Sequence, residues 1–202
     1  ANKLLARTLR HIKAACPIRL ISFNGGTAHN AIPRDASATI ACEAAHIQTM
    51  QNMVSDFKQT LSNEYGALEK NMSLSLLQLD KNHKQKTALS AADTDNVMNL
   101  LQVIPHGVQS MSPDFENLVE TSANLATVSI ENGKLQILTS QRSSVRSRRE
   151  AITSTVEAAA ALAGADSRRE NDYPPWQPDM DAVLLKRCTD LYRKLFDHEP
   201  VI

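Results

Sequence analysis

The chain has 202 residues, 42% of them apolar, with 22 basic and 22 acidic side chains, so its formal net charge is zero. This length can bury one large core or two small ones. The charge balance gives no bulk electrostatic basis for binding nucleic acid or an anionic membrane. No apolar run approaches the roughly 20 residues of a membrane-spanning helix.

The cysteines and the amino terminus bear on the compartment. Cys16, Cys42 and Cys188 are far apart in the sequence and form no CxxC pair. An odd, scattered set of this kind is typical of a reducing compartment. The first residues lack the apolar segment of a secretory signal peptide. These features predict a cytoplasmic protein.

The first half of the chain predicts helix, strand, strand, helix, strand. Apolar residues at steps of three and four indicate the helices, and alternating or continuous apolar runs indicate the strands. The expected elements are a helix ending at Cys16-Pro17, strands over 18–23 and 36–42, an amphipathic helix over 47–65 closed by Gly66, and a strand over 72–76. Residues 81–86 are charged and amide-rich, which predicts a solvated loop.

The connection between the first two strands, residues 24–35, is the stretch best suited to contact a ligand. Gly25 and Gly26 allow positive φ and leave room for a close approach. Pro33 has no N–H group and favours extended geometry before it, so the return strand begins after it. The polar side chains of this connection, which are suited to face a cleft, are Asn24, Thr27, His29 and Asn30.

The second half predicts a similar order of elements. A capping signal at Ser90 begins a helix that ends at Pro105, and Asn132-Gly133 between alternating runs predicts a hairpin. The other expected elements are a linker over 106–117, strands over 125–130 and 134–139, a helix from the capping box Ser147–Glu150 to Gly164, a short edge strand over 167–172, a rigid connector over 173–178, and a helix over 184–195.

Together these elements predict an α+β fold. The order α-β-β-α-β occurs twice, over about 1–86 and 87–202, and suits two pseudo-repeated, ferredoxin-like units. An antiparallel sheet covered by helices, within a single domain, is therefore expected.

A second polar constellation lies where the hairpin meets the following helix. Arg142, backed by serines and by the free N–H groups of a helix start, is suited to bind a carboxylate, and equally suited to a simple salt bridge. Arg146, Arg148 and Arg149 are interpreted as a solvated basic face. RNA binding is a weak alternative for them, because aromatic residues are not interleaved and the net charge is not positive.

The sequence offers no self-contained active site. Six histidines are scattered without the spacing of a zinc site. The glycine pair lacks the Gly-Lys-Ser/Thr ending of a phosphate loop, and no GxSxG motif is present.

Several motifs resemble those of a known family. Asn24-Gly25-Gly26-Thr27 is followed by Asn30-Ala31-Ile32-Pro33-Arg34-Asp35-Ala36. This order resembles the lid-domain signature of the M20 metallopeptidases, in the branch of the aminoacyl-histidine dipeptidases. Further matches, in the family's order, are the segments 1–7, 107–108, 111–112, 120–125, 141–144 and 173–176.

The resemblance implies that residues 1–202 form one lid domain inserted in a longer zinc dipeptidase. The family's two zinc ions are bound by a catalytic domain outside this chain, so no metal is expected here and the chain alone should be inactive. The implied partners are the protein's own catalytic domain, a dipeptide such as one with carboxy-terminal histidine, and a second copy in a homodimer. Ala1 and Ile202 should lie close together, as the ends of an inserted domain do.

The resemblance also implies roles for residues of this chain. Asn30 and Arg142 are expected to bind substrate, and four residues are expected to form or support the substrate loop: Gly25, Gly26, Thr27 and Asn124. No catalytic residue is expected. His29 departs from the family pattern, and the resemblance places the lid-associated histidine before Ala1.

Two other functions remain open from the sequence. The chain is also suited to be a stand-alone module that dimerises through a sheet edge or helix face. A ferredoxin-like domain that binds a small regulatory ligand is the third alternative.

Overall fold

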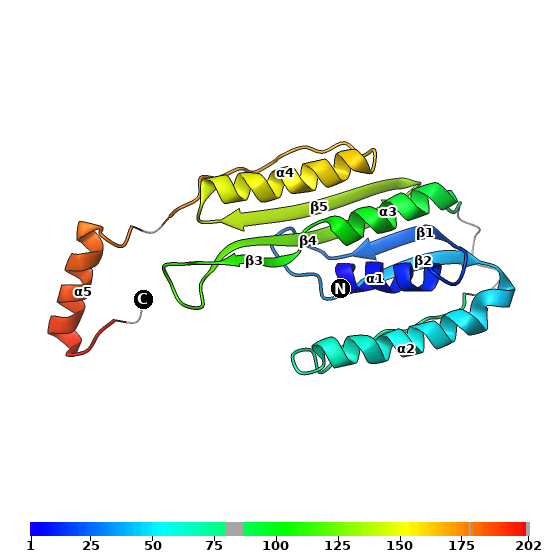
Figure 1. Cartoon of the computed structure of the whole chain (residues 1–202), viewed down its shortest axis with the longest axis horizontal. Coiled ribbons are helices and arrows are strands. Elements are labelled where there is room, and N and C mark those ends of the chain that lie inside the picture. Colours follow the sequence, from blue (N-terminus) through cyan, green and yellow to red (C-terminus); the bar gives the residue numbers. More distant parts are fainter. Residues whose placement is uncertain (80–86, 178, 201–202) are drawn as a thin grey trace.

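The structure is a computed structural model that describes residues 1–79, 87–177 and 179–200. It confirms the α+β class and the antiparallel sheet covered by helices (Figure 1). In chain order the elements are α1 (Asn2–Lys13), β1 (Ile18–Gly25), β2 (Ala36–Cys42), the 3₁₀ turn η1 (Ala44–His46), α2 (Ile47–Tyr65), α3 (Ala91–Val103), β3 (Gly107–Met111), β4 (Val119–Glu131), β5 (Lys134–Ser143), α4 (Arg146–Leu162) and α5 (Val183–Phe196).

The sheet is organised around the long strand β4. On one edge β4 pairs with β5, from Thr121 opposite Ser143 to Glu131 opposite Lys134. On the other edge β3 pairs with the first part of β4, and β1 pairs with its last part. β2 continues the sheet beyond β1. Strands β3 and β1 therefore lie end to end along one side of β4.

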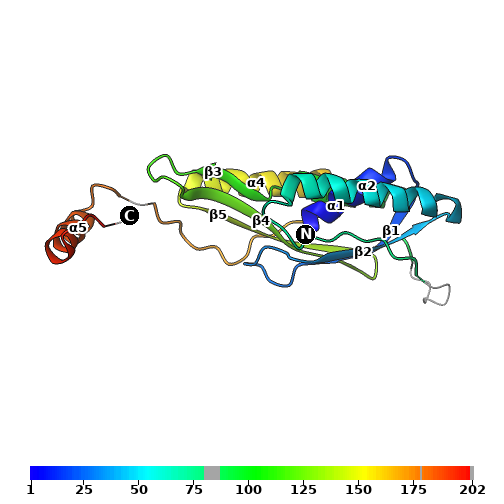
Figure 2. The same cartoon turned by 90° about the horizontal axis from the view of Figure 1, so that it is seen from below.

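The core lies between one face of the sheet and the helices. Figures 1 and 2 show α1 to α4 on the same side of the sheet. The side chains of Leu20, Phe23 and Leu125 are fully buried on that side. An irregularity in β1 between Leu20 and Ser22 brings Phe23 to the same face as Leu20. Ile12 of α1 and Leu101 of α3 pack in the same cluster. No helix of the described residues covers the opposite face of the sheet.

Local signals placed two element ends correctly. The backbone N–H of Asp93 donates to Ser90 Oγ at 3.0 Å, which caps α3 as predicted. Asn132 and Gly133 have φ of 52° and 74°, as a tight hairpin turn between β4 and β5 requires. The predicted capping box at Ser147 is wrong, because α4 begins at Arg146 and makes no side-chain cap bond.

Three predicted elements differ in the structure. Residues 72–76 form no strand, because Leu74 and Leu76 pack on the core without a sheet partner. Residues 107–111 of the predicted linker form β3, which pairs with β4. Residues 167–172 form no strand, and Asn171 within them has a φ of 54°. The second half therefore reads α-β-β-β-α-α rather than α-β-β-α-β. The predicted loop at 81–86 and the position of Ile202 lie outside the described residues.

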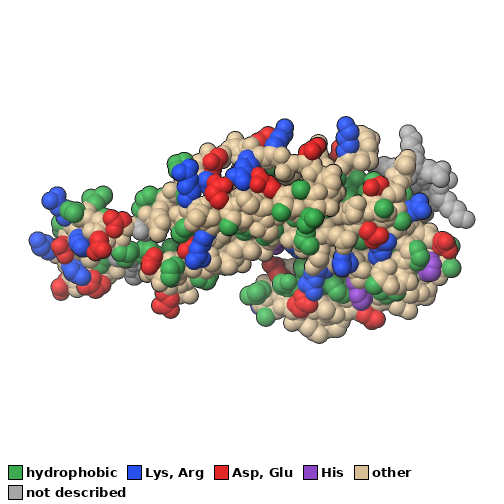
Figure 3. Space-filling model, turned by 45° about the horizontal axis from the view of Figure 1, so that its top comes forward, with side chains coloured by type: hydrophobic (Ala, Val, Ile, Leu, Met, Phe, Trp, Pro, Cys, Tyr) green, Lys and Arg blue, Asp and Glu red, His purple; other side chains and the backbone are tan. Residues whose placement is uncertain are grey.

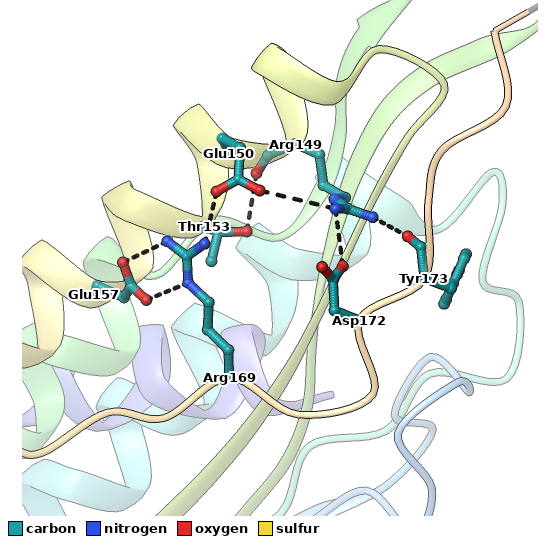
Figure 4. Close-up of polar contacts among 7 residues, drawn as sticks. All are labelled: Arg149, Glu150, Thr153, Glu157, Arg169, Asp172 and Tyr173. Carbon is teal, nitrogen blue, oxygen red and sulfur yellow. Dashed lines mark hydrogen bonds and ion pairs between the residues drawn. The ribbon is translucent and has the colours of Figure 1, made fainter.

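Residues 165–177, here called the strap, run back along α4 toward α5 (Figure 1). Arg169 of the strap forms ion pairs of 2.6 Å with both Glu150 and Glu157 of α4. Arg149 of α4 reaches the strap in return, pairing with Asp172 at 2.8 Å and donating to the Tyr173 carbonyl oxygen (Figure 4). These contacts hold the strap against α4.

Helix α5 lies away from the rest of the molecule (Figures 1 and 2). No residue of α5 is buried, and the apolar side chains of Leu184, Leu191 and Leu195 are all exposed.

Candidate functional site on the open face of the sheet

An open hollow of about 340 Å³ lies where the loop over residues 26–35 meets strands β3, β4 and β5. It brings together Asn30, Asn124 and Arg142, three of the six residues predicted to serve the substrate. The other residues lining it are His29, Ile32, His106, Gly107, Val108, Val119, Ser122, Ala123 and Ser140.

The floor of the hollow is the helix-free face of the sheet. Ser122 of β4 stands opposite Arg142 of β5, and Asn124 stands opposite Ser140. Since successive side chains of a strand point to opposite faces, these four polar residues share one face. Their neighbours Ala123 and Leu125 are buried on the other side. Successive side chains of β4 thus point in turn to the core on one face of the sheet and to the hollow on the other.

Asn124 ties the loop to this floor. Its Nδ2 donates to the carbonyl oxygen of Ala31 at 2.8 Å. Because Ala31 follows Asn30 directly, this bond sets where Asn30 sits at the rim. The Oδ1 atom of Asn124 is buried and has no hydrogen-bond partner in the described parts of the chain. That oxygen is an acceptor available to a ligand N–H group.

The glycine pair is explained by close packing within the protein. A Cβ on Gly25 would lie 1.9 Å from Asn2 Oδ1, and one on Gly26, where φ is +76°, would lie 1.8 Å from the Ala126 carbonyl oxygen. The close approach expected from the sequence is therefore made by the Asn2 side chain at Gly25 and by the β4 backbone at Gly26. Neither glycine lines the hollow, and Thr27 is exposed outside it. Their contact with substrate remains a prediction.

Side chains bond to the stretch of β4 that pairs with neither β1 nor β3. Asn2 Nδ2 donates to the carbonyl oxygens of Leu125 at 3.1 Å and Ala126 at 3.4 Å. The Leu125 N–H group donates to Nδ1 of His106 at 3.1 Å. Burial, with the positive charges of the amino terminus and Lys3, lowers the pKa of His106 from its ordinary value of 6.5.

The arginines near the start of α4 behave differently from one another. Arg142 is exposed and makes no ion pair with any described residue, so the salt-bridge alternative is not what the structure shows. Arg148 pairs with Glu120 at 3.0 Å, and the Glu120 carboxylate is buried. Arg149 is buried against the strap, so the prediction of a solvated basic face is wrong for this residue.

The polar lining of the hollow consists of Asn, Ser and His side chains, which can donate and accept hydrogen bonds, and of one permanent charge, Arg142. Among the described residues that line it, none carries a carboxylate. Such a site favours a ligand group that is anionic or rich in acceptors, and disfavours an ammonium group. Elsewhere, on the face shown in Figure 3, basic and acidic side chains are interspersed.

Residues 1–79, 87–177 and 179–200 contain no group of His, Cys, Asp and Glu side chains that could hold a metal ion. The side chains present therefore do not fit a zinc site, and we derive no step through a metal. Nor does that part of the chain contain a helix both long and apolar enough to cross a membrane.

Comparison with known proteins places this arrangement in a family. Residues 1–69 match the model of the peptidase dimerisation domain of the M20 peptidases. The whole chain is 36% identical to the cytosol non-specific dipeptidase of Escherichia coli (strain K12), of which it covers 41%. It also superposes on the crystal structure of aminoacylhistidine dipeptidase from Vibrio alginolyticus with a TM-score of 0.93. The chain belongs to the M20 peptidase dimerisation domains.

The match to the Vibrio structure covers 99% of this M20 dimerisation domain and 40% of that chain, at 30% identity. The chain thus spans about two fifths of the length of the relatives it matches. Both relatives are dipeptidases by name.

Sequence reasoning missed two residues of this M20 dimerisation domain that shape the site. Asn2 lies in the matching segment 1–7 but was given no role there, and His106 lies in the stretch interpreted as a linker. The role of a polar residue beside the unpaired stretch of β4 can be recognised only when the pairing of β4 is known.

Proposed function

We propose that this chain is the substrate-covering lid of a longer, cytoplasmic, zinc-dependent dipeptidase, and that it is inactive alone. The observation that carries the proposal is the convergence of Asn30, Asn124 and Arg142 on one hollow without a carboxylate. The names of the two relatives supply the reaction class, hydrolysis of dipeptides, including those with carboxy-terminal histidine. Two zinc ions, bound outside this chain, would supply Lewis-acid chemistry.

The lid's own residues orient the dipeptide. Arg142 binds the free carboxylate through charge-assisted hydrogen bonds, for which a guanidinium is the best-suited side chain. The positive charge of Arg142 repels the ammonium end, so the dipeptide enters the hollow with its carboxylate first. The side-chain amide of Asn30 donates to the carbonyl oxygen of the scissile bond, where negative charge develops. Closure of the loop over the substrate excludes water.

A second role, homodimer formation, is favoured by the matching family model and by the outer edge of β5. In the described sheet β5 pairs only with β4. An unpaired edge of this length is a template for pairing with a second copy. The two roles are compatible, because the hollow lies on the sheet face rather than at the β5 edge.

The test of the lid proposal is Arg142→Ala in the full-length protein, assayed with free dipeptides and with the same dipeptides amidated at the carboxy terminus. Hydrogen bonds to a charged group contribute about 1.5–3 kcal/mol, so KM for free dipeptides should rise about 10- to 150-fold. For amidated dipeptides, which lack the carboxylate, KM should rise by less than about threefold.

Arg146→Ala is the matched control, because Arg146 is exposed on α4 and lies outside the hollow. It should leave both KM values unchanged. Equal losses on free and amidated dipeptides for Arg142→Ala would refute the carboxylate assignment.

A further inference from the structure

His106 occupies a position that no motif assigns. It precedes β3, which begins at Gly107, and it faces the stretch of β4 that β1 and β3 leave unpaired. Its ring accepts the Leu125 N–H group at Nδ1 and lines the same hollow as Arg142 and Asn30. One side chain therefore closes a gap in the sheet and borders the site.

The bond to Leu125 fixes the protonation state of the ring. A nitrogen that accepts from a backbone N–H group carries no proton, so Nδ1 is deprotonated. The single proton of the neutral imidazole is then on Nε2. Burial and the positive charges of the amino terminus and Lys3 lower the pKa of His106, which disfavours a second proton on the ring.

The Nε2–H group is consequently a fixed donor. It makes no hydrogen bond to another group within residues 1–79, 87–177 and 179–200. A carboxylate has about four acceptor positions, so it can accept from Arg142 and from a further donor at the same time. The hollow needs a second, less mobile donor to hold a carboxylate in one orientation.

We propose that Nε2–H of His106 is that second donor, contacting the ligand carboxylate whose other partner is Arg142. This inference rests on the proposed function of the hollow. The two residues reach the site from β3 and β5, on either side of β4, where Ser122 and Asn124 form the floor between them. His106 is rigid because Leu125 holds it, whereas Arg142 is exposed and adaptable.

The matched pair His106→Asn and His106→Asp tests the inference in the full-length protein. Both side chains place an oxygen where Nδ1 lies, so both retain an acceptor for the Leu125 N–H group. Only Asn retains an N–H donor, and Asp adds a charge that repels a carboxylate. His106→Asn should change KM for free dipeptides by less than about threefold, and His106→Asp should raise it at least about tenfold.

Two controls accompany this test: amidated dipeptides as substrates, and substitutions of a histidine outside the hollow. KM for amidated dipeptides should stay within about twofold of the wild-type value for both His106 variants. The control pair His46→Asn and His46→Asp, outside the hollow, should leave KM unchanged for free and for amidated dipeptides. Equal KM values for His106→Asn and His106→Asp, or equal losses on both substrates, would overturn the role of His106. Failure of Arg142→Ala to distinguish the substrates would instead overturn the proposed function.

Discussion

At the scale of single residues, the space around Gly26 decides how the loop joins the sheet. Its φ of +76° is unfavourable for any residue with a Cβ, and the Ala126 carbonyl oxygen occupies the place where that Cβ would go. Both reasons for glycine that the sequence suggested, positive φ and a close approach, therefore act at this one position.

Gly26→Ala should therefore destabilise the chain by at least about 2 kcal/mol, since left-handed strain alone costs about 1–2 kcal/mol and the overlap with β4 adds to it. Urea unfolding followed by circular dichroism measures this loss. Gly164→Ala is the matched control, because Gly164 has φ of +71° but no atom near the added Cβ. It should cost about 1 kcal/mol. Equal losses would show that β4 does not restrict position 26.

His106 makes stability depend on pH in a defined direction. Because burial lowers the pKa of the folded-state imidazole below the unfolded value of 6.5, the unfolded chain binds more protons in the window between the two. The stabilisation is complete above pH 6.5 and is lost as the pH falls through the folded-state pKa.

His106→Asn should flatten this part of the pH profile, because Asn keeps the Leu125 contact and does not titrate. The measurement is the urea midpoint between pH 7.5 and 5, for both proteins. A wild-type midpoint that rises on acidification relative to the variant would contradict the assigned protonation state.

At the scale of elements, the strap depends on side chains of α4 rather than on backbone pairing. Arg149 is buried, whereas its partner Asp172 is exposed, so removing the arginine releases the strap without leaving a buried carboxylate. The single tryptophan of the chain, Trp176, lies in the strap and reports its motion.

Arg149→Met keeps most of the apolar stem and removes the contacts to Asp172 and Tyr173. The fluorescence anisotropy of Trp176 should fall, while the far-ultraviolet circular dichroism stays unchanged. Arg168→Met is the control, since Arg168 pairs only with Glu170 within the strap. An unchanged anisotropy for Arg149→Met would mean that Arg149 does not hold the strap.

The elements that could be predicted from the sequence are those determined locally. Ser90 caps the helix that follows it, and Asn132-Gly133 adopts the turn its residues favour. Strand β3 was missed because Gly107–Met111 has no alternating apolar pattern, and only β4 makes it a strand. Conversely, residues 72–76 alternate but have no strand to pair with.

The candidate site also combines features that the local sequence determines with features that depend on strand pairing. Asn30 and Arg142 stand out by residue type and by family resemblance, yet they are far apart in the sequence. Their meeting depends on the register that places Arg142 opposite Ser122, and on the Asn124 bond to Ala31. His106 was missed because its role arises from a gap in the sheet, which no sequence window contains.

At the scale of the whole molecule, self-association is expected to extend the sheet through β5. Two other strands, β2 and β3, also pair with a single neighbour, but β5 is the longest of the three. Between Lys134 and Arg142 it carries no charged residue. Charges along an edge are a common protection against pairing, and the centre of this edge lacks them.

A lysine in the uncharged part of the edge should therefore weaken the dimer. Gln136 is exposed there, and a two-fold symmetric strand pair would bring two new positive charges into one interface. Gln136→Lys should raise the dimer dissociation constant at least about tenfold, because like charges that face each other across an interface can cost several kcal/mol. Sedimentation equilibrium over a range of concentrations measures the constant.

Gln51→Lys provides the matched control, with the same change on the exposed surface of α2. It should leave the dissociation constant unchanged, and neither variant should alter the thermal midpoint of the dissociated chain. A wild-type chain that stays monomeric at high concentration would exclude self-association by this domain. A dissociation constant that rises equally for Gln136→Lys and Gln51→Lys would place the interface away from β5. The role of the hollow would still be tested separately, by Arg142→Ala.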